Sequence, residues 1–187
     1  MQKTKITAIV GSLRKDSFNR KLALEAKRIV GNEAEFDILD YSDVPLFNQD
    51  YEYPAPDAVS RVRSIVQASD GIWFFTPEYN HFFPGVLKNL IDWLSRPISP
   101  EVPQVLGGKP AVISGISPGR SGTVIAQDHL VTLISFINMK VMNVPRLVIP
   151  NAMQQTDSAG NLTLTESRVF LEQQAHDFIQ FVRKSGC

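Results

Sequence analysis

The chain has 187 residues, which suits one domain, and 43% of them are apolar, enough for a sizeable core. Its 19 basic and 19 acidic residues balance, so the net charge of zero gives no support for nucleic acid or an anionic membrane surface as a partner. No signal-peptide pattern or apolar run of the ~20 residues needed for a membrane span is present, and the only cysteine is Cys187, so we expect a cytoplasmic protein without an internal disulfide or a cysteine-based metal site.

The first part of the chain predicts strands that alternate with helices. A short apolar run predicts a strand over Lys5–Gly11, and apolar residues at helical spacing predict a helix over Ser17–Val30. A second, half-buried strand follows at Glu35–Leu39. Residues Asp40–Pro56 are rich in Pro, Asp and Asn and predict a long loop, and loops of this length are often functional.

The middle of the chain repeats this alternation. Residues Asp57–Ser69 predict a helix with Asp57 as its N-cap. Gly71–Phe75 is continuously apolar, as expected of a strand buried on both faces of a parallel sheet. Pro84 fits the first turn of the next helix. The apolar stripe of that helix is expected to face the core and consists of Val86, Leu87, Leu90, Ile91 and Leu94.

The last third of the chain predicts two further strand–helix pairs. A buried strand is expected over Lys109–Ser117 and a helix over Gly122–Met139. Arg146–Pro150 predicts the last strand, and Thr165–Lys184 predicts an amphipathic helix. The side chains of this helix that are expected to point inward are Val169, Phe170, Ala175, Phe178, Ile179 and Val182.

Strands that alternate with helices predict an α/β fold with a parallel sheet covered on both faces. About five strands in one domain favour the flavodoxin-like three-layer sandwich, with strand order 2-1-3-4-5. In such sheets, ligands bind beyond the carboxyl ends of the strands where the strand order reverses. Here that crevice is expected between the first and third strands.

The turn after the first strand combines a helix N-terminus with polar side chains. Unpaired N–H groups and a partial positive charge at a helix N-terminus attract phosphate. Ser12, Ser17 and Asn19 add neutral donors, and Arg14 adds a charge that can bind phosphate bidentately. The alternative is that Ser17 only caps the helix and that Arg14 points to solvent. The turn has neither the P-loop spacing nor the dinucleotide fingerprint.

The turn after the third strand, Thr76–Gly85, mixes aromatic and polar side chains between two prolines. A flat conjugated ring needs apolar walls and a few polar groups at its edge, and this turn offers both. The alternative is that its aromatic side chains, Tyr79, Phe82 and Phe83, fill the core. The histidines of the chain lack the spacing of metal ligands, so we expect no metal site.

A third loop rich in small residues, Ser114–Thr123, follows the fourth strand. Small residues let a ligand approach the backbone closely. Its Arg120 is a candidate to face the ligand, a nicotinamide cofactor's phosphate or a partner subunit, and the alternative is a plain flexible loop. In the expected strand order, the three loops meet at one crevice.

Several motifs together resemble one family. Ser12, Arg14, Ser17 and Asn19 form the pattern S-x-R-x-x-S-x-N. It is accompanied by "PLFNQD" at Pro45–Asp50, "PEYN" at Pro77–Asn80, "PGVLKNLIDW" at Pro84–Trp93 and "GKP" at Gly108–Pro110. From about Lys5 to Ile149, the chain resembles the NADPH-dependent FMN reductase family, which includes chromate- and quinone-reducing flavoproteins and several azoreductases.

The resemblance implies that residues 1–187 form a single flavodoxin-like domain that binds one FMN. It assigns the FMN phosphate to Ser12, Arg14, Ser17 and Asn19. It assigns the ribityl chain and the ring to Pro77, Glu78, Tyr79 and Asn80, and the far side of the ring to Ser117 and Gly119. The chain departs from the family pattern at Thr123, where a glycine is common, and at the bulky residues His81, Phe82 and Phe83.

The resemblance also implies an enzyme that transfers hydride from NADPH or NADH through FMN to a small-molecule electron acceptor: a quinone, an azo compound, chromate or free flavin. The cofactor carries such chemistry, so no catalytic dyad or triad is required. A second hypothesis is a flavodoxin-like electron carrier, or a redox-responsive FMN-binding protein, without NAD(P)H turnover. The family further implies self-association as a dimer or tetramer through Tyr79–Phe83 and the helix from Pro84 to Ser95. The alternative is a monomer in which Trp93 and Phe83 belong to the core.

Overall fold

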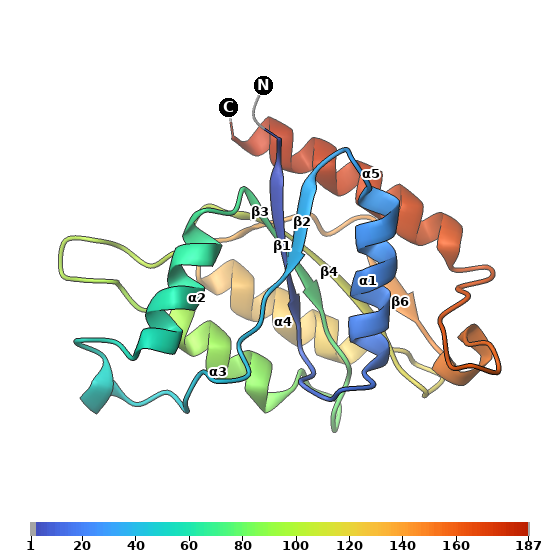
Figure 1. Ribbon diagram of the computed structural model, residues 1–187, viewed down its shortest axis with the longest axis horizontal. Coiled ribbons are helices and arrows are strands. Elements are labelled where there is room, and N and C mark those ends of the chain that lie inside the picture. The colour runs from blue at the N-terminus through green and yellow to red at the C-terminus, as the bar shows by residue number, and fades with distance from the viewer. Residues whose placement is uncertain (1–2, 187) are drawn as a thin grey trace.

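The computed structural model describes residues 3–186, so Cys187 and the expectations that rest on it lie outside the described residues. The strands are β1 (Lys5–Val10), β2 (Glu35–Ile38), β3 (Gly71–Phe75), β4 (Pro110–Ile116), β5 (Lys140–Val141) and β6 (Leu147–Ile149). The pairings between these strands are all parallel, and the order is β2-β1-β3-β4-β5, with β6 also paired with β4. Figure 1 labels every strand of this sheet except β5. The expected flavodoxin-like sheet is confirmed.

The edge of the sheet beside β4 differs from the prediction, which placed a single strand there over Arg146–Pro150. Two short strands share the outer side of β4: β5 pairs with its first residues and β6 with Ser114–Ile116. Pro145 lies between β5 and β6 and has no N–H to donate to a ladder, so pairing stops and starts again. β5 has only two residues, too few to give a periodic signal in the sequence.

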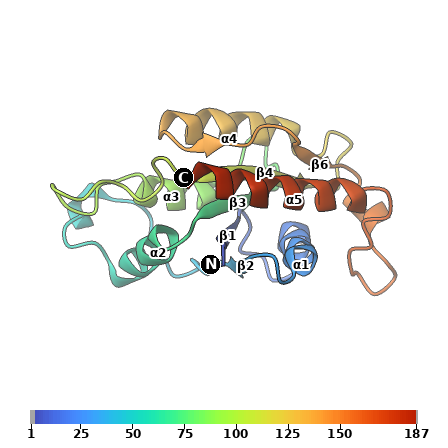
Figure 2. The same ribbon diagram turned by 90° about the horizontal axis from the view of Figure 1, so that it is seen from above.

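Within residues 3–186, five α-helices cover the two faces of the sheet (Figure 2). One hydrophobic cluster joins α1 and α5 to one face, and another joins α2, α3 and α4 to the other. The helices are α1 (Phe18–Val30), α2 (Asp57–Gln67), α3 (Gly85–Leu94), α4 (Val124–Phe136) and α5 (Arg168–Ser185), and the 3-10 turns are η1 (Gln49–Tyr51) and η2 (Ala152–Gln155). No helix of residues 3–186 is both long and apolar enough to cross a membrane.

Strand β3 is buried on both faces, as predicted. Trp73 and Phe75 join the cluster beneath α1 and α5, whereas Ile72 and Phe74 join the cluster beneath α2, α3 and α4. The Trp73 ring stacks on Phe75 with 5.2 Å between centroids and meets Phe178 of α5 edge-on at 5.6 Å. The core therefore fixes the carboxyl end of β3, from which a site loop departs.

Two expectations for the helix starts are wrong. Asp57 is the first residue of α2 and not its N-cap; the cap position is Pro56, which makes no side-chain cap hydrogen bond. The Asp57 carboxylate still lies in the first turn, where the helix dipole favours negative charge. Pro84 is likewise the residue before α3, with extended backbone angles, and not part of its first turn.

Three side chains expected in the core are exposed. Val169 and Phe170 are 59% and 62% exposed because they precede the buried stripe of α5, which begins at Leu171. Successive helix residues are rotated by about 100°, so these two residues point away from that stripe. Val86 lies at the edge of the buried stripe of α3 and is 40% exposed.

The loop after β2 is fastened to α3. The Phe47 N–H donates to Asn89 Oδ1 at 2.7 Å, and the side-chain N–H groups of Asn89 and Trp93 donate to the Pro45 carbonyl at 2.9 Å. The buried Glu52 carboxylate accepts hydrogen bonds from Arg96, which lower the pKa of Glu52. The long loop is therefore anchored beside the site.

Candidate functional site

The three predicted loops meet at the carboxyl ends of β1, β3 and β4, where they enclose a cavity of about 210 Å³ that we call the cofactor cavity. Most of the predicted site residues line it: Ser12, Arg14, Ser17, Asn19, Pro77, Glu78, Tyr79 and Ser117. Asn80 and Gly119 belong to the same loops but do not line it. Phe18, Ile116 and Pro118 line it and were not predicted.

The β1–α1 turn presents free hydrogen-bond donors. Within residues 3–186, no group accepts a hydrogen bond from the backbone N–H groups of residues 12–16. The exposed Arg14 guanidinium has no hydrogen-bond acceptor or ion-pair partner there either. These donors lie at the positive end of α1, so the turn has the chemistry of a phosphate site.

Ser17 both caps α1 and lines the cofactor cavity. Its Oγ accepts a hydrogen bond from the Arg20 N–H at 3.3 Å, so Ser17 caps the helix, as the alternative interpretation of this turn expected. The Ser17 hydroxyl hydrogen remains available for a ligand. Capping and phosphate binding are therefore compatible at this residue.

Asn19 holds two elements together. Its Nδ2 donates to the Ile116 carbonyl at 2.9 Å, and its Oδ1 accepts from the Ile116 N–H at 3.1 Å. The side chain is buried, so it clamps the first turn of α1 to the end of β4. One amide N–H is left for a ligand, and the main contribution of Asn19 visible in the structure is to position two walls of the cavity.

The β3–α3 loop is a tight hairpin. Tyr79 and Phe82 exchange two backbone hydrogen bonds, of 2.9 and 3.0 Å, and Asn80 and His81 between them have φ angles of 54° and 61°. Positive φ at both central residues is the signature of a type I′ turn, which favours Asn. Asn80 therefore occupies the tip of the turn, and the half-exposed Tyr79 is turned to the cavity.

Glu78 connects this hairpin to the neighbouring helix. Its Oε2 accepts hydrogen bonds from the N–H groups of Ile125 and Ala126, both at 3.0 Å, at the start of α4. Its Oε1 lies 3.4 Å from His81 Nδ1. The residue before α4, Thr123, gives no side-chain cap hydrogen bond, so Glu78 supplies the cap from another loop. This cap joins groups 47 and 48 residues apart, so no local sequence pattern predicts it.

The β4–α4 loop folds back onto β6. Ser117 Oγ donates to the Gly122 carbonyl at 2.6 Å, and the Gly119 carbonyl accepts from the Asn151 N–H at 3.1 Å. Gly122 has a φ of +62°, and a Cβ there would lie 2.5 Å from a methyl group of Val148. The loop is therefore held by defined contacts, in contrast to the plain flexible loop considered as an alternative.

The bulky side chains at positions 81–83 do not line the cofactor cavity. Phe83 is buried in the core, as the alternative for this loop held, and Trp93 is buried as well. Phe82 is 44% exposed, and its ring stacks on His129 of α4 with 4.4 Å between centroids. Phe82 is thus part of an aromatic surface beside the cavity.

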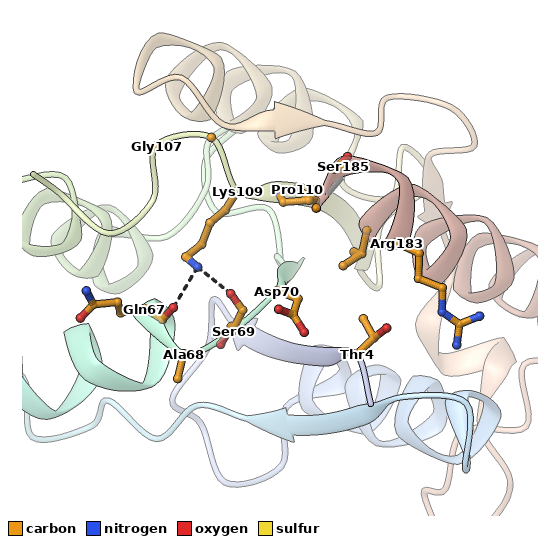
Figure 3. A pocket seen from close by; sticks show the side chains of 13 residues that line it. Thr4, Gln67, Ala68, Ser69, Asp70, Gly107, Lys109, Pro110, Arg183 and Ser185 are labelled. Atoms are coloured by element: carbon orange, nitrogen blue, oxygen red, sulfur yellow. Dashed lines mark hydrogen bonds between the residues drawn. The ribbon is translucent and has the colours of Figure 1, made fainter. Parts of the chain in front are cut away.

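A cavity of about 520 Å³ lies at the opposite, amino-terminal end of the sheet (Figure 3). Lys109 crosses it and donates to the carbonyls of Gln67 and Ser69, at 3.1 and 2.6 Å. Asp70 accepts a hydrogen bond from the Lys5 N–H at 2.7 Å. Lys109 and Asp70 therefore already have partners within residues 3–186, in contrast to the donors of the β1–α1 turn, and burial lowers the pKa of Lys109. No cluster of possible metal ligands occurs among residues 3–186.

A parallel sheet of this order, with free donors after its first strand and a cavity between its strand-end loops, is the arrangement of flavodoxin-like mononucleotide-binding proteins. Residues 4–154 match the model of the family described as NADPH-dependent FMN reductase, and the chain belongs to that family.

Relatives of full length support this assignment. The chain is 40% identical to an NAD(P)H-dependent FMN reductase of Pseudomonas aeruginosa, over 96% of both chains. It is 37% identical to a 2-hydroxy-1,4-benzoquinone reductase of a Burkholderia species, again over 96% of both chains. The solved structure of FerB, a flavoenzyme NAD(P)H:(acceptor) oxidoreductase of Paracoccus denitrificans, matches with a TM-score of 0.88 and 33% identity, over 98% of this chain and 99% of FerB.

Proposed function

We propose that the chain is an FMN-dependent NAD(P)H oxidoreductase that reduces quinones and related small-molecule acceptors. The observation that carries the proposal is the convergence of three strand-end loops on one cavity with unpaired donors at the N-terminus of α1. In this proposal, residues 1–187 form one FMN-binding domain that works in the cytoplasm. Membership of the family and the reductase names of the relatives favour an enzyme over an electron carrier.

The residues present fit FMN. The phosphate would accept hydrogen bonds from Arg14, from the hydroxyls of Ser12 and Ser17, and from the free backbone N–H groups of residues 12–16. When bound, FMN supplies the hydride and electron chemistry. Pro77, Glu78 and Tyr79 would line the ribityl chain and one side of the ring, and Ser117 would line the other. Asn19 and Glu78 keep these walls together, and Asn80 and Gly119 would contribute from the rim of the cavity.

The shape of the cavity suits an exposed ring. Enclosed sites for drug-sized ligands measure about 300–1,000 Å³. The cofactor cavity is smaller, at about 210 Å³, so part of the FMN would lie outside it. In this proposal the exposed part of the ring meets nicotinamide and then the acceptor. The relatives' names indicate quinones as acceptors, and azo compounds, chromate and free flavin remain further candidates from the family resemblance.

Stopped-flow kinetics test the proposed activity. We expect the FMN-loaded protein to be reduced by NADPH or NADH fast enough to account for turnover, and to oxidise NAD(P)H with a benzoquinone by ping-pong kinetics, because one site serves both substrates in turn. An FMN-loaded protein whose reduction by both nicotinamides is far slower than any useful turnover would instead support the electron carrier.

Self-association is proposed through the aromatic surface beside the cavity. Tyr79, Phe82 and Val86 are exposed apolar side chains there, and a second chain lying on them would cover the open edge of the cofactor cavity. The buried Phe83 and Trp93 are core residues and are not part of this surface.

Light scattering of a charge variant tests this surface. We expect a wild-type dimer or tetramer, and we expect Phe82→Asp to dissociate it, because a carboxylate would be buried at the contact. The matched control is Phe170→Asp, on the other side of the sheet, which should leave the mass unchanged. A wild-type monomer, or the same mass for Phe82→Asp as for wild type, would refute the surface.

A further inference from the structure

A lysine reaches across the cavity at the amino-terminal end of the sheet. Lys109 immediately precedes β4, and its side chain crosses the cavity to the end of α2 (Figure 3). Its Nζ donates to the carbonyls of Gln67 and Ser69, at 3.1 and 2.6 Å. Lys109 therefore clamps the beginning of β4 to the junction between α2 and β3.

Lys109 lacks the carboxylate partner that other lysines of the chain have. Lys21, Lys27 and Lys88 pair with aspartates at 2.5, 3.1 and 2.6 Å. Lys109 forms no ion pair within residues 3–186. Asp70 lines the same cavity and attracts the Lys109 ammonium from beyond ion-pair distance. Burial lowers the pKa of Lys109, and the opposing attraction of Asp70 is the smaller effect.

The two hydrogen bonds of Lys109 leave its nitrogen open in one direction. An ammonium group has three N–H donors, and within residues 3–186 only two of those on Lys109 have acceptors. A neutral amine has two N–H groups, so it keeps both carbonyl partners and directs its lone pair away from them. Loss of the proton therefore costs Lys109 no hydrogen bond to these carbonyls. In the neutral form, the nitrogen is a nucleophile.

The cavity around this nitrogen has room for a small reactant. Its volume of about 520 Å³ lies within the range of small-molecule sites, about 300–1,000 Å³. The charged side chains that line it are Lys109, Arg183 and Asp70. Arg183 carries the positive charge and planar donors that suit a phosphate group. An acyl phosphate combines such a group with a small acyl carbon that is activated toward amines.

We propose that Lys109 is a modification site for small acyl phosphates, and that its acylation weakens the clamp between β4 and the end of α2. The Lys109 Nζ attacks the acyl carbon, and a C–N bond forms as the C–O bond to phosphate breaks. Inorganic phosphate leaves with the electron pair, and the nitrogen loses a proton to solvent. The amide product has one N–H, so the carbonyl of Gln67 or of Ser69 loses its donor. The inference is independent of the proposed redox function.

Peptide mass spectrometry of the FMN-loaded protein, treated with acetyl phosphate, tests the site. We expect Lys109 to be acetylated about tenfold faster than Lys27 or Lys88, because carboxylates hold those two as ammonium groups. Asp70→Asn should raise the rate at Lys109 and leave Lys88 unchanged, because it removes the carboxylate that favours the Lys109 ammonium. Its amide oxygen can still accept from the Lys5 N–H. Acetyl-CoA carries the same acetyl group on a larger carrier, so the ratio of Lys109 to Lys88 acetylation should be lower with it.

A Lys109→Arg protein is the matched control for the clamp, because a guanidinium keeps N–H donors and is not acylated. Treatment with acetyl phosphate should lower the urea midpoint of the wild type more than that of Lys109→Arg. Equal changes in the two midpoints would overturn the weakening of the clamp. Acetylation of Lys109 no faster than that of Lys88 would overturn the site itself, and a higher ratio with acetyl-CoA would overturn the assignment to acyl phosphates.

Discussion

Replacing Arg14 with alanine is expected to weaken FMN binding by about 1.5–3 kcal/mol, or roughly ten- to a hundredfold in Kd, the usual size for a hydrogen bond to a charged group. Arg14 lies at the mouth of the cofactor cavity without an ion-pair partner among residues 3–186, so its charge is available to the phosphate. Quenching of FMN fluorescence on titration with apoprotein measures the Kd directly.

Riboflavin provides a control for the Arg14 experiment because it has the same ring but no phosphate. Arg14→Ala should leave riboflavin binding unchanged if the guanidinium acts on the phosphate alone. Lys27→Ala, which removes a charge from the far end of α1, should keep the wild-type Kd for FMN. An Arg14→Ala protein that binds FMN as tightly as wild type does would remove Arg14 from the phosphate site.

Replacing Asn19 with alanine is expected to lower the free energy of unfolding of the apoprotein by about 2–6 kcal/mol, because two buried backbone groups lose their partners at a cost of about 1–3 kcal/mol each. Those groups are the N–H and carbonyl of Ile116, which Asn19 binds at 3.1 and 2.9 Å. Urea denaturation without FMN measures this effect free of cofactor binding.

An exposed asparagine serves as the control for the clamp. Asn161 hydrogen-bonds to Asp157 on an exposed turn, and Asn161→Ala should change the free energy of unfolding far less than Asn19→Ala. If the two variants unfold at the same urea concentration, the clamp contributes little, and Asn19 acts mainly on the ligand.

Local patterns predicted most of the elements of this fold. The continuous apolar run at Gly71–Phe75 identified β3 with its observed bounds, because a strand buried on both faces leaves a strong signal. Val169 and Phe170 were misplaced because their apolar character does not reveal that the buried stripe starts at Leu171. The division of the last strand into β5 and β6 follows from tertiary pairing with β4, which periodicity does not report.

In the candidate site, too, some features were predictable from the sequence and others were not. The loops were predictable because the carboxyl ends of parallel strands share one edge, and glycine, serine and proline mark the turns there. The partners of Asn19 and Glu78 were not, because these side chains bind backbone groups 97 and 47 or 48 residues away. The Asn80–His81 turn left a usable local signal in its asparagine, which the sequence analysis assigned to ligand contact instead.

A crystal structure of the protein with FMN tests the central claim most directly, because it locates both ends of the cofactor. We expect the phosphate within hydrogen-bonding distance of Arg14 and the N–H groups of residues 12–16, and the ring between Pro77–Tyr79 and Ser117. A phosphate bound elsewhere, for example beside Lys109 at the amino-terminal end of the sheet, would contradict the account.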